Sequence, residues 1–380
     1  MRIAHVTDFY LPRLGGIELH VHDLAARQQA AGHDVEIITG TPAAPGGSDD
    51  GLVVRRLRRV RGLPVYLDPV VFVTGRRLVR QGGYDVVHVH AGVCLPLAYG
   101  AASAAAHSGV PVVVTQHSLV DWFAPLLRGL DWVFRWSRWP VLFTAVSDVA
   151  AEPLRILLRG RAGVSILPNG IDPAAWSVQP IPRRPDDVLV VAVMRLAPRK
   201  RPLQMLRVMR KVRRTLPASN RLRLVVVGEG GERRSLERYV RRHRMQGWVS
   251  LPGRFDRDRI RELYRQADLF IAPATLESFG IAALEARAAG VPVVARIEGG
   301  VSGFVGAGEG MLVGSDAEMV HAITRLVAEP VAREAMAARC RATEPPFGWP
   351  QVVARTDEAY LAALTVAGVR RPAEPVSIAS

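Results

Sequence analysis

The sequence has 380 residues, a formal net charge of +15 and 49% hydrophobic residues. This length is too great for one ordinary hydrophobic core, and we therefore expect two domains. Only two cysteines occur, Cys94 and Cys340, which excludes a disulfide framework and a cysteine zinc site. The excess of positive charge indicates anionic partners such as phosphates, nucleic acid or an acidic membrane surface, unless the arginines only decorate solvated helices.

The N-terminal stretch MRIAHVTDFY lacks the long apolar region of a signal peptide. The sequence also lacks any run of about 18 uncharged apolar residues, so we expect no membrane-spanning helix. The expected location is the cytoplasm, with peripheral contact to the inner face of an anionic membrane as a further expectation.

Short apolar runs rich in Val and Ile alternate with helical stretches along the chain. This pattern predicts parallel sheets that are covered by helices on both faces. A segment rich in proline and charge, residues 176–187, is the best candidate linker between two domains. The predicted strands begin at Arg2, Val35, Asp85, Pro111, Leu142 and Val164 before this linker, and at Val188, Leu222, Asp268 and Val291 after it. We therefore predict an α/β protein of two doubly wound domains that face a ligand-binding cleft.

Gly15 and Gly16 lie between the first predicted strand and an amphipathic helix that should begin near Ile17. Glycines at such a turn let backbone N–H groups approach a phosphate near the positive end of the helix dipole. The alternative is an ordinary turn, because the stretch lacks the spacing G-x-G-x-x-G of a dinucleotide site.

Three histidines lie near the ends of predicted strands in the first domain. His88 and His90 share one face of their strand, and His117 follows the next strand at the position where the cleft should open. For His88 and His90 we favour structural or cleft-lining roles over a metal pair, since no third ligand is evident in the sequence.

A segment over residues 121–140 contains more aromatic side chains and arginines than a routine surface loop. Such a composition is typical of an amphipathic segment at a membrane interface. A helix buried against its own domain is the alternative. The aromatic residues are Trp122, Phe123, Trp132, Phe134, Trp136 and Trp139.

Arg195 and Lys200 flank a turn that follows the first strand of the second domain. A guanidinium and a flexible ammonium at this position suit a diphosphate, although two solvated cations would look the same. Further along, Asp256 and Asp258 have the spacing of a metal-binding Asp-x-Asp, but an N-cap of the following helix is the simpler interpretation.

Two acids, Glu277 and Glu285, lie eight residues apart in the stretch ESFGIAALE. The helix should begin near Phe279 or Gly280 and end at Gly290. Both acids can then face one side, at most about 12 Å apart along the helix axis. They suit two hydroxyl-bearing parts of one extended ligand, with the helix N-terminus between them for a phosphate. The alternative is one capping and one solvated glutamate.

Taken together, these motifs resemble the family 4 retaining glycosyltransferases, which have the GT-B architecture of two Rossmann-like domains. The resemblance runs from GGIELHVHDLA through ILPNGID to GWPQVVARTDEAY. Its most specific part is Glu277 with Glu285, preceded by Arg195 and Lys200. The stretches VTDFYLPRLGGIE and TQHSL are most similar to family members that act on phosphatidylinositol, both N-acetylglucosaminyltransferases and mannosyltransferases. The family member of mycothiol synthesis is also similar.

The resemblance implies an acceptor-binding domain over residues 1–178, to which a C-terminal helix at about 349–366 returns. It implies a nucleotide-sugar-binding domain over residues 179–348 and a tail over 367–380. The implied reaction is retaining transfer of a hexose or N-acetylhexosamine from a nucleotide diphosphate sugar, UDP-sugar first and GDP-mannose next, to a hydroxyl of a lipid-linked or small-molecule acceptor. It requires no cofactor and no metal ion.

The resemblance also assigns the donor-binding residues of the second domain. Glu285 would bind the ribose hydroxyls of the nucleotide. Glu277 would hold the donor sugar together with the N–H groups of Phe279 and Gly280, and Ile281 would belong to the same donor site.

The remaining assigned residues concern the diphosphate and the acceptor. Arg195 and Lys200 would neutralise the diphosphate, and the turn at Gly15 and Gly16 would approach it from the other domain. His117 would line the sugar and acceptor site. We thus expect His117, Arg195, Lys200 and Glu277 to act in catalysis.

One departure from the family and several rival functions remain. Gly303 stands where many relatives have a glutamate, which affects the fit of the donor sugar. The rivals are a sugar phosphorylase, a nucleotide-sugar epimerase and a non-catalytic sugar-binding relative. A nucleic-acid-binding protein is not expected, because the arginines are spread over many helices and no nucleic-acid-binding motif occurs.

Overall fold

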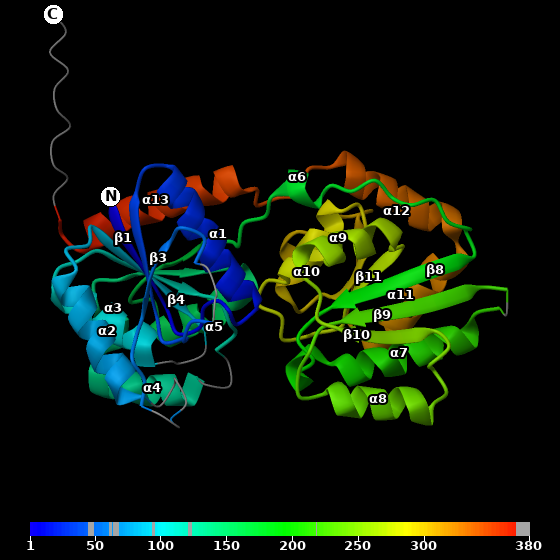
Figure 1. The fold of residues 1–380 in the computed structure, drawn as a ribbon, viewed down its shortest axis with the longest axis horizontal. Helices are drawn as coiled ribbons and strands as arrows, with labels where there is room; N and C mark the ends of the chain where they lie inside the picture. The colour runs from blue at the N-terminus through cyan, green and yellow to red at the C-terminus, as the bar shows by residue number, and fades with distance from the viewer. Residues whose placement is uncertain are drawn as a thin grey trace, which may run out of the picture. The chain divides into compact units, whose positions relative to one another are not determined.

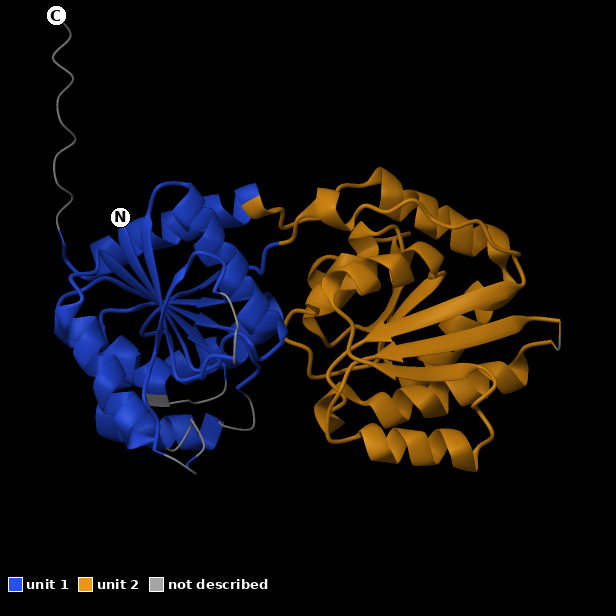
Figure 2. Ribbon diagram, viewed as in Figure 1, with its two compact units in different colours: residues 1–170, 350–380 blue, residues 171–349 orange. Residues whose placement is uncertain are grey.

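The computed structural model describes residues 1–44, 49–60, 63, 68–92, 96–120, 124–217 and 219–369. The chain divides into two compact units (Figure 2): unit 1 comprises residues 1–170 and 350–380, and unit 2 comprises residues 171–349. The sequence predicted the boundary between the first and second domains after residue 178, whereas the structure places it after residue 170. The segment after Gly170 instead belongs to unit 2 because its helix α6 (Pro173–Trp176) packs there, with Trp176 against Tyr264.

Unit 1 is built on a seven-stranded sheet in the order β3-β2-β1-β4-β5-β6-β7 (Figure 1). All neighbouring strands run parallel. The order reverses between β1 and β4, and a ligand usually binds at the carboxyl ends of strands beside such a reversal. The strands are β1 (Arg2–Thr7), β2 (Asp34–Thr39), β3 (Val53–Arg56), β4 (Val86–Ala91), β5 (Val112–Gln116), β6 (Leu142–Ala145) and β7 (Val164–Ile166).

Helices cover both faces of this sheet, as the Val-rich strands predict. Along β1, Ala4 and Val6 belong to a core cluster with residues of α2, α3 and α5. Ile3 belongs to a cluster on the opposite face with residues of α1 and with Tyr360 of α13. The helices are α1 (Gly16–Ala30), α2 (Pro69–Gln81), α3 (Pro96–His107), α4 (Ala124–Phe134), the 3-10 helix η3 (Trp136–Arg138), α5 (Asp148–Leu158) and α13 (Trp349–Val366).

Unit 2 contains a six-stranded sheet in the order β10-β9-β8-β11-β12-β13, again with parallel neighbours. Here too the order reverses in the middle, between β8 and β11. The strands are β8 (Asp187–Val193), β9 (Arg221–Val227), β10 (Val249–Gly253), β11 (Leu269–Ala272), β12 (Val293–Arg296) and β13 (Gly310–Val313).

The sheet of unit 2 is also covered on both faces. Leu269 and Ile271 of β11 belong to a core cluster with residues of α7, α8 and α11, whereas Phe270 contacts Tyr264 of α9 on the other face. Besides α6, the helices are α7 (Pro202–Thr215), α8 (Arg233–Arg242), α9 (Arg257–Gln266), α10 (Ile281–Ala288), α11 (Asp316–Ala328), α12 (Pro330–Ala342) and the 3-10 helices η4 (Pro198–Lys200) and η5 (Gly300–Gly303).

The expected fold class is confirmed: both units are doubly wound parallel α/β structures of the Rossmann type. Three strands were not predicted, namely β3, β10 and β13, and each forms an edge of its sheet. Two arginines in β3, and Ser250 and Pro252 in β10, interrupt the apolar run that marks a central strand. The strand β13 is apolar but has only four residues. Within the described part of the chain, no helix combines the length and the apolar character needed to cross a membrane.

Candidate functional site

The two charged motifs of unit 2 meet at one ion pair, between the Lys200 ammonium and the Glu277 carboxylate. Lys200 ends η4, which follows β8, and Glu277 lies in the loop that follows β11. Because β8 and β11 pair in the sheet, these two loops emerge side by side at its carboxyl edge. The side chains are 18% and 17% exposed, so the pair is partly accessible to a ligand.

Helix α10 begins beside this pair, close to the helix start that the sequence predicted. Gly280 is its N-cap in the left-handed conformation, with φ of +91°, and Ile281 is its first residue. A Cβ at position 280 would lie 2.5 Å from Cγ2 of Val301, so only glycine fits this turn. Phe279 is buried against Phe304 and Phe347 and anchors the loop. The first amide groups of α10 therefore have a fixed place next to Glu277.

A second glycine loop, which the sequence connected to the site only through Gly303, packs on the Glu277 loop. The Gly300 amide donates to the Glu277 carbonyl at 2.7 Å. A Cβ at Gly300 would lie 2.3 Å from the Ser278 carbonyl oxygen, whereas a Cβ at Gly303 would meet no described atom within 4 Å. The position at which many relatives have a glutamate is thus open to a side chain.

Glu285 lies within α10, two turns after Glu277, as predicted. It is half-buried, and its neighbour Tyr264 donates from its hydroxyl to the Ala282 carbonyl at 3.1 Å. Burial first, and then the negative charge of Glu285, raise the pKa of Tyr264. Glu277 and Glu285 therefore occupy the loop and the helix that the sequence predicted for them.

Arg195 follows β8 and is exposed. It makes no ion pair with any residue that the structure describes, in contrast to Lys200. Leu196, between the two cations, is fully buried and its amide bonds the Glu229 carbonyl at 2.9 Å. The structure therefore places Arg195 at the same sheet edge as Lys200 but leaves its guanidinium in solvent.

A network of ion pairs near the same edge was not predicted from the sequence. Arg201 pairs with Asp316 at 2.8 Å, Arg296 pairs with Asp316 at 3.1 Å, and Arg296 also pairs with Glu298 at 2.5 Å. Although burial opposes the shift, hydrogen bonds from Arg201 and Gln204 lower the pKa of Asp316. These residues come from segments far apart in the sequence, so only the strand order brings them together.

The glycine-rich loop after β9 was also missed. Gly228 and Gly230 have φ of +141° and +158°, and a Cβ at either position would collide with the carbonyl oxygen of Met194 or Leu196. The loops after β8 and β9 therefore pack backbone against backbone. The available signal was the stretch GEGG directly after a strong apolar run.

In unit 1, the Gly15–Gly16 turn contains a carboxylate. Helix α1 begins at Gly16, close to the predicted start, and Gly15 is extended. A Cβ at Gly15 would lie 2.3 Å from Oε2 of Glu18, and Glu18 pairs with Arg13 at 3.2 Å. Glu18 thus lies close to position 15, and the assignment of Gly15 and Gly16 to a phosphate stays a prediction.

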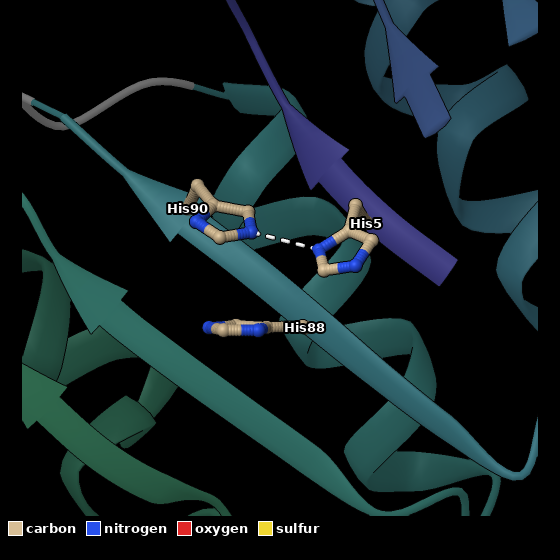
Figure 3. A group of neighbouring side chains, drawn as sticks. All are labelled: His5, His88 and His90. Atoms are coloured by element: carbon tan, nitrogen blue, oxygen red, sulfur yellow. Dashed lines mark hydrogen bonds between the residues drawn. The ribbon is translucent and has the colours of Figure 1, made fainter. Parts of the chain in front are cut away.

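His117 follows β5 and is buried within a group of histidines. Its Nε2 lies 3.0 Å from Nδ1 of His90, and burial lowers its pKa to about 3. The expectation that His88 and His90 lack a third neighbour is wrong, because β1 lies beside β4 and brings His5 to them (Figure 3). His20 of α1 lies close to His90 and His117 in the same way.

The aromatic segment is partly exposed and partly buried. Helix α4 exposes Leu126, Val133 and Phe134, and Trp132 is 85% exposed. Trp136, in contrast, is 3% exposed, and its indole N–H donates to the Leu127 carbonyl at 3.1 Å. The buried-helix interpretation therefore holds for Trp136, and the membrane-interface interpretation stays a prediction for the exposed part of the segment. Trp122 and Phe123 lie outside the described residues, as does Cys94.

The interpretation of Asp256 as a helix cap is confirmed. Its carboxylate accepts from the Arg259 amide at 2.8 Å at the start of α9. Asp258 pairs with Arg261 on the same helix. The Asp-x-Asp spacing is therefore explained without a ligand.

Two sequence profiles match the chain: "Glycosyl transferases group 1" over residues 177–343 and "Glycosyltransferase Family 4" over residues 14–175. The glycogen synthase of Mycobacterium tuberculosis is 29% identical, and the match covers 98% of this chain and 97% of that protein. One component of the phosphatidylinositol N-acetylglucosaminyltransferase of Arabidopsis thaliana is 27% identical, with 96% of this chain and 82% of that protein covered.

Solved structures share the fold. Anabaena HepE in complex with UDP and glucose superposes with a TM-score of 0.73 at 18% identity, covering 95% of this chain and all of HepE. WaaG, a glycosyltransferase of lipopolysaccharide biosynthesis, gives 0.69 at 18% identity, covering 96% of this chain and 100% of WaaG.

The two parallel-sheet units and the two profile matches define a glycosyltransferase of GT-B architecture. The chain belongs to the family 4 glycosyltransferases, and the two profiles together match residues 14–175 and 177–343.

Proposed function

We propose that the protein transfers a hexose or N-acetylhexosamine from a nucleotide diphosphate sugar to a hydroxyl acceptor, with retention of configuration and without a metal ion. UDP-sugars are the first choice of donor and GDP-mannose the second. The observation that carries this proposal is the Lys200–Glu277 ion pair beside the left-handed Gly280 that starts α10.

The charges of unit 2 suit a diphosphate leaving group. Cleavage of the bond between the sugar and the diphosphate builds negative charge on the phosphate oxygens. Lys200 and the solvent-exposed Arg195 would neutralise this charge, and the first amides of α10 would donate to it. Glu277 holds the Lys200 ammonium in place before the donor binds and would accept from hydroxyls of the donor sugar. Glu285, two turns along, would accept from the ribose hydroxyls.

Retention follows if the leaving phosphate takes the proton of the acceptor hydroxyl on the face that it leaves. In this route no separate carboxylate nucleophile is required, unlike in the paired-carboxylate glycosidases. His117 of unit 1 is neutral at pH 7 because burial lowers its pKa to about 3, so we assign it to binding hydroxyl groups. Gly15 and Gly16 are assigned to the approach of unit 1 to the diphosphate.

Solved structures of similar fold support UDP-sugars as the first donors to test. HepE was solved with UDP and with UDP-glucose. The name of the matched phosphatidylinositol N-acetylglucosaminyltransferase component indicates a lipid acceptor. Starch synthase IV of Arabidopsis thaliana, also similar in fold, was solved with ADP, which makes ADP-sugars a necessary member of any test panel.

Thermal unfolding with UDP, GDP, ADP and their common sugars, each with magnesium and with EDTA, tests the proposal. A ligand at a hundredfold its Kd adds roughly 2.7 kcal/mol to the free energy of unfolding. We expect a shift with one nucleotide that EDTA does not abolish. A shift only with inorganic phosphate would instead identify a phosphorylase, and no shift with any of these compounds would contradict the donor assignment.

We further propose that unit 1 binds an anionic membrane surface through α4, which favours a lipid-linked acceptor. Trp132, Val133 and Phe134 form an exposed apolar end of this helix. Exposed arginines lie beside it at positions 128, 135 and 138, while the nearby Asp131 is already engaged by Ser137 and Arg161. Aromatic side chains flanked by arginines match the chemistry of an anionic bilayer surface.

Co-sedimentation with vesicles of phosphatidylcholine, with and without phosphatidylglycerol, tests this contact. Substitution of Trp132 and Phe134 by Ala should abolish binding to the anionic vesicles. Val331→Ala, at an exposed apolar residue of α12, is the matched control and should bind like the wild type. Trp136 is unsuitable as a probe because it is buried. Unchanged binding of the double variant would refute the membrane contact.

A further inference from the structure

A groove over helix α7 of unit 2 has no role in the proposed function. Its volume is about 450 Å³, which is within the range of small-molecule sites, roughly 300–1,000 Å³. Side chains of α7, of α8 and of the start of α11 line it. Helix α7 contacts both of the other helices, and α8 runs beside it in Figure 1. The groove is therefore formed within unit 2 alone.

The sequence of α7 gives the groove its positive charge. Arg207, Arg210 and Arg214 follow one another at spacings of three and four residues, so they share one face of the helix. Met209 and Val212 are buried on the opposite side and fix the rotation of the helix on the sheet. The three arginines extend over about 10 Å along the helix axis. Helix α7 contains no acidic residue that could neutralise them.

Carboxylates of the neighbouring helices do not neutralise these arginines either. Arg210 and Arg214 form no ion pair with any residue in the described part of the chain, and Arg207 donates to the uncharged Gln204 side chain at 3.2 Å. Asp316 also lines the groove, but it already belongs to the ion-pair network at the carboxyl edge. Because like charges on one helix face repel each other, an anion in the groove would relieve this repulsion.

An aromatic pair of α8 lies beside the arginines. Tyr239 and His243 line the groove, with ring centroids 4.2 Å apart and planes at 57°. The pKa of His243 is lowered, first by desolvation and then by the charges of nearby arginines, of which Arg210 has the largest effect. The positive potential of the groove thus acts on the imidazole of His243, which makes this ring a local reporter of any bound anion.

Compensation of helix dipoles explains only part of this charge. Cations in the last turn of a helix interact favourably with its negative end, and Arg214 of α7 and Arg242 of α8 occupy such positions. Arg207 and Arg210, in contrast, lie in the middle of α7. Their placement therefore indicates a ligand rather than the helix end.

The surroundings of the groove favour a soluble ligand over a membrane surface. Among the described residues of α7 and α8, none is a large apolar side chain exposed to solvent. Helix α4 of unit 1 differs in this respect, since it exposes Trp132 and Phe134. A concave surface with guanidinium groups and no apolar side chain for insertion suits a small anion better than a bilayer.

We propose that the groove over α7 binds a soluble anion with two or more phosphate groups, such as a sugar bisphosphate or a short polyphosphate. Guanidinium groups bind phosphate oxygens in a bidentate manner, and their spread along the helix matches an extended anion rather than a single phosphate. This site is separate from the donor site, because Arg214 lies roughly 18 Å along α7 from Pro202, the end next to Lys200. It does not depend on the proposed sugar transfer.

NMR titration of His243 with tripolyphosphate tests this proposal in the full-length protein. The His243→Asn variant assigns the resonance. Bound phosphates oppose the charge of the arginines, so tripolyphosphate should raise the pKa of His243, and added NaCl should weaken this effect. An unchanged pKa of His243 at millimolar tripolyphosphate would overturn the proposal.

Arginine variants test whether the groove itself holds the anion. Arg210→Gln and Arg214→Gln should each weaken the binding of tripolyphosphate about tenfold, because each removes a charge-assisted contact. Arg355→Gln, at an exposed arginine of α13 in unit 1, changes the net charge equally and should bind like the wild type. Equal weakening in all three variants would show that net charge alone attracts the anion and would refute the groove.

Three further titrations identify the place and the kind of ligand. Lys200→Ala should keep the effect of tripolyphosphate on His243, and loss of this effect would place the anion at the donor site and refute a separate one. Inorganic phosphate should bind at least about tenfold more weakly than tripolyphosphate, since it offers fewer contacts.

Vesicles of phosphatidylcholine and phosphatidylglycerol provide the third titration, with the Trp132 and Phe134 double variant to remove the contact of α4. A response of His243 to these vesicles but not to tripolyphosphate would identify a lipid surface and contradict the proposal. If no nucleotide sugar binds to the protein, the proposed sugar transfer fails, whereas the response of His243 to tripolyphosphate still decides whether this site exists.

Discussion

The carboxyl edges of the two sheets have the same topology but opposite chemistry. In unit 1 this edge carries neutral imidazoles, of which His117 is 4% exposed. In unit 2 it carries ionised pairs such as Lys200 with Glu277, at 18% and 17% exposure. An ion loses several kcal/mol of hydration when it is fully buried, so the buried imidazoles stay uncharged, whereas the charged groups of both units, such as Glu18 with Arg13 and Lys200 with Glu277, lie in ion pairs.

This difference suits two different parts of one substrate. A layer of neutral donors and acceptors distinguishes hydroxyl groups by direction, since each imidazole has one donor and one acceptor. Cations paired with carboxylates suit a diphosphate, because its binding depends more on neutralisation of its charge than on the direction of individual hydrogen bonds. Under the proposed function, the same sheet topology would serve sugar recognition in one unit and phosphate recognition in the other.

The largest expected effect is a loss of folding stability between pH 7 and pH 5 that is confined to unit 1. The folded pKa is about 4 for His5 and about 3 for His117, against about 6.5 in the unfolded chain. Below pH 6.5 the unfolded state therefore binds more protons, and the free energy of unfolding falls by roughly 1.4 kcal/mol per pH unit for each buried histidine. Burial raises the pKa of Asp8 to about 7, so protonation of Asp8 stabilises the folded state as the pH falls. This one carboxyl group opposes the effect of several histidines.

Unit 2 should respond only at lower pH. Although burial opposes the shift, hydrogen bonds from Arg287 and Thr343 lower the pKa of Glu309 to about 2. The stability that Glu309 contributes is therefore present above pH 4.5 and is lost as the pH falls toward 2. Hydrogen exchange measured by mass spectrometry at pH 7 and pH 5 reports each unit separately. Equal loss of protection in both units at pH 5 would contradict the comparison.

The second effect concerns the charged edge. Lys200→Ala and Glu277→Ala should each lower kcat by about 10²–10³-fold, because the developing charge loses a preorganised partner. Lys211→Ala removes an exposed cation of α7 and should leave kcat unchanged. Nucleotide release from the preferred donor is the readout, with circular dichroism to verify folding. Near-native turnover of either site variant would remove that residue from the mechanism.

The smallest effects compare two glycines of η5. Gly300→Ala places a Cβ 2.3 Å from the Ser278 carbonyl oxygen, so the Glu277 loop must move, and we expect a loss of about 1–3 kcal/mol of stability. Gly303→Ala meets no described atom within 4 Å and should change stability by less than about 0.5 kcal/mol. Urea unfolding measures both. A larger loss for Gly303→Ala would show that the open space at this position is filled.

Central features of the fold could be predicted from the sequence because their signals are local. The Val-rich central strands, the start of α10 at Ile281 and the placement of Glu277 in a loop each follow from a few neighbouring residues. The edge strands β3 and β10 could not, because an edge position tolerates the polar residues and the proline that interrupt their apolar pattern. The edge strand β13 could not because it has only four residues.

The parts of the site that were missed depend on strand order. His5 is far from His88 in sequence, yet β1 and β4 pair in the sheet and set His5 opposite His88. The Arg201–Asp316–Arg296 network likewise joins segments at or after the ends of β8, β12 and β13. A motif within one segment of the sequence cannot reveal contacts between residues of different strands. The alternation of His88 and His90 along one strand did indicate a polar layer in an otherwise apolar sheet.

The return of α13 to unit 1 also affects the order in which the protein is made. Residues 350–369 complete the core around Ile3 and supply Tyr360 to Gln28 and His88, but the ribosome synthesises them after all of unit 2. At about 5–20 residues per second, the first unit waits on the order of ten seconds or longer for this helix. We therefore expect unit 2, although second in the sequence, to be the first to reach its native state on the ribosome.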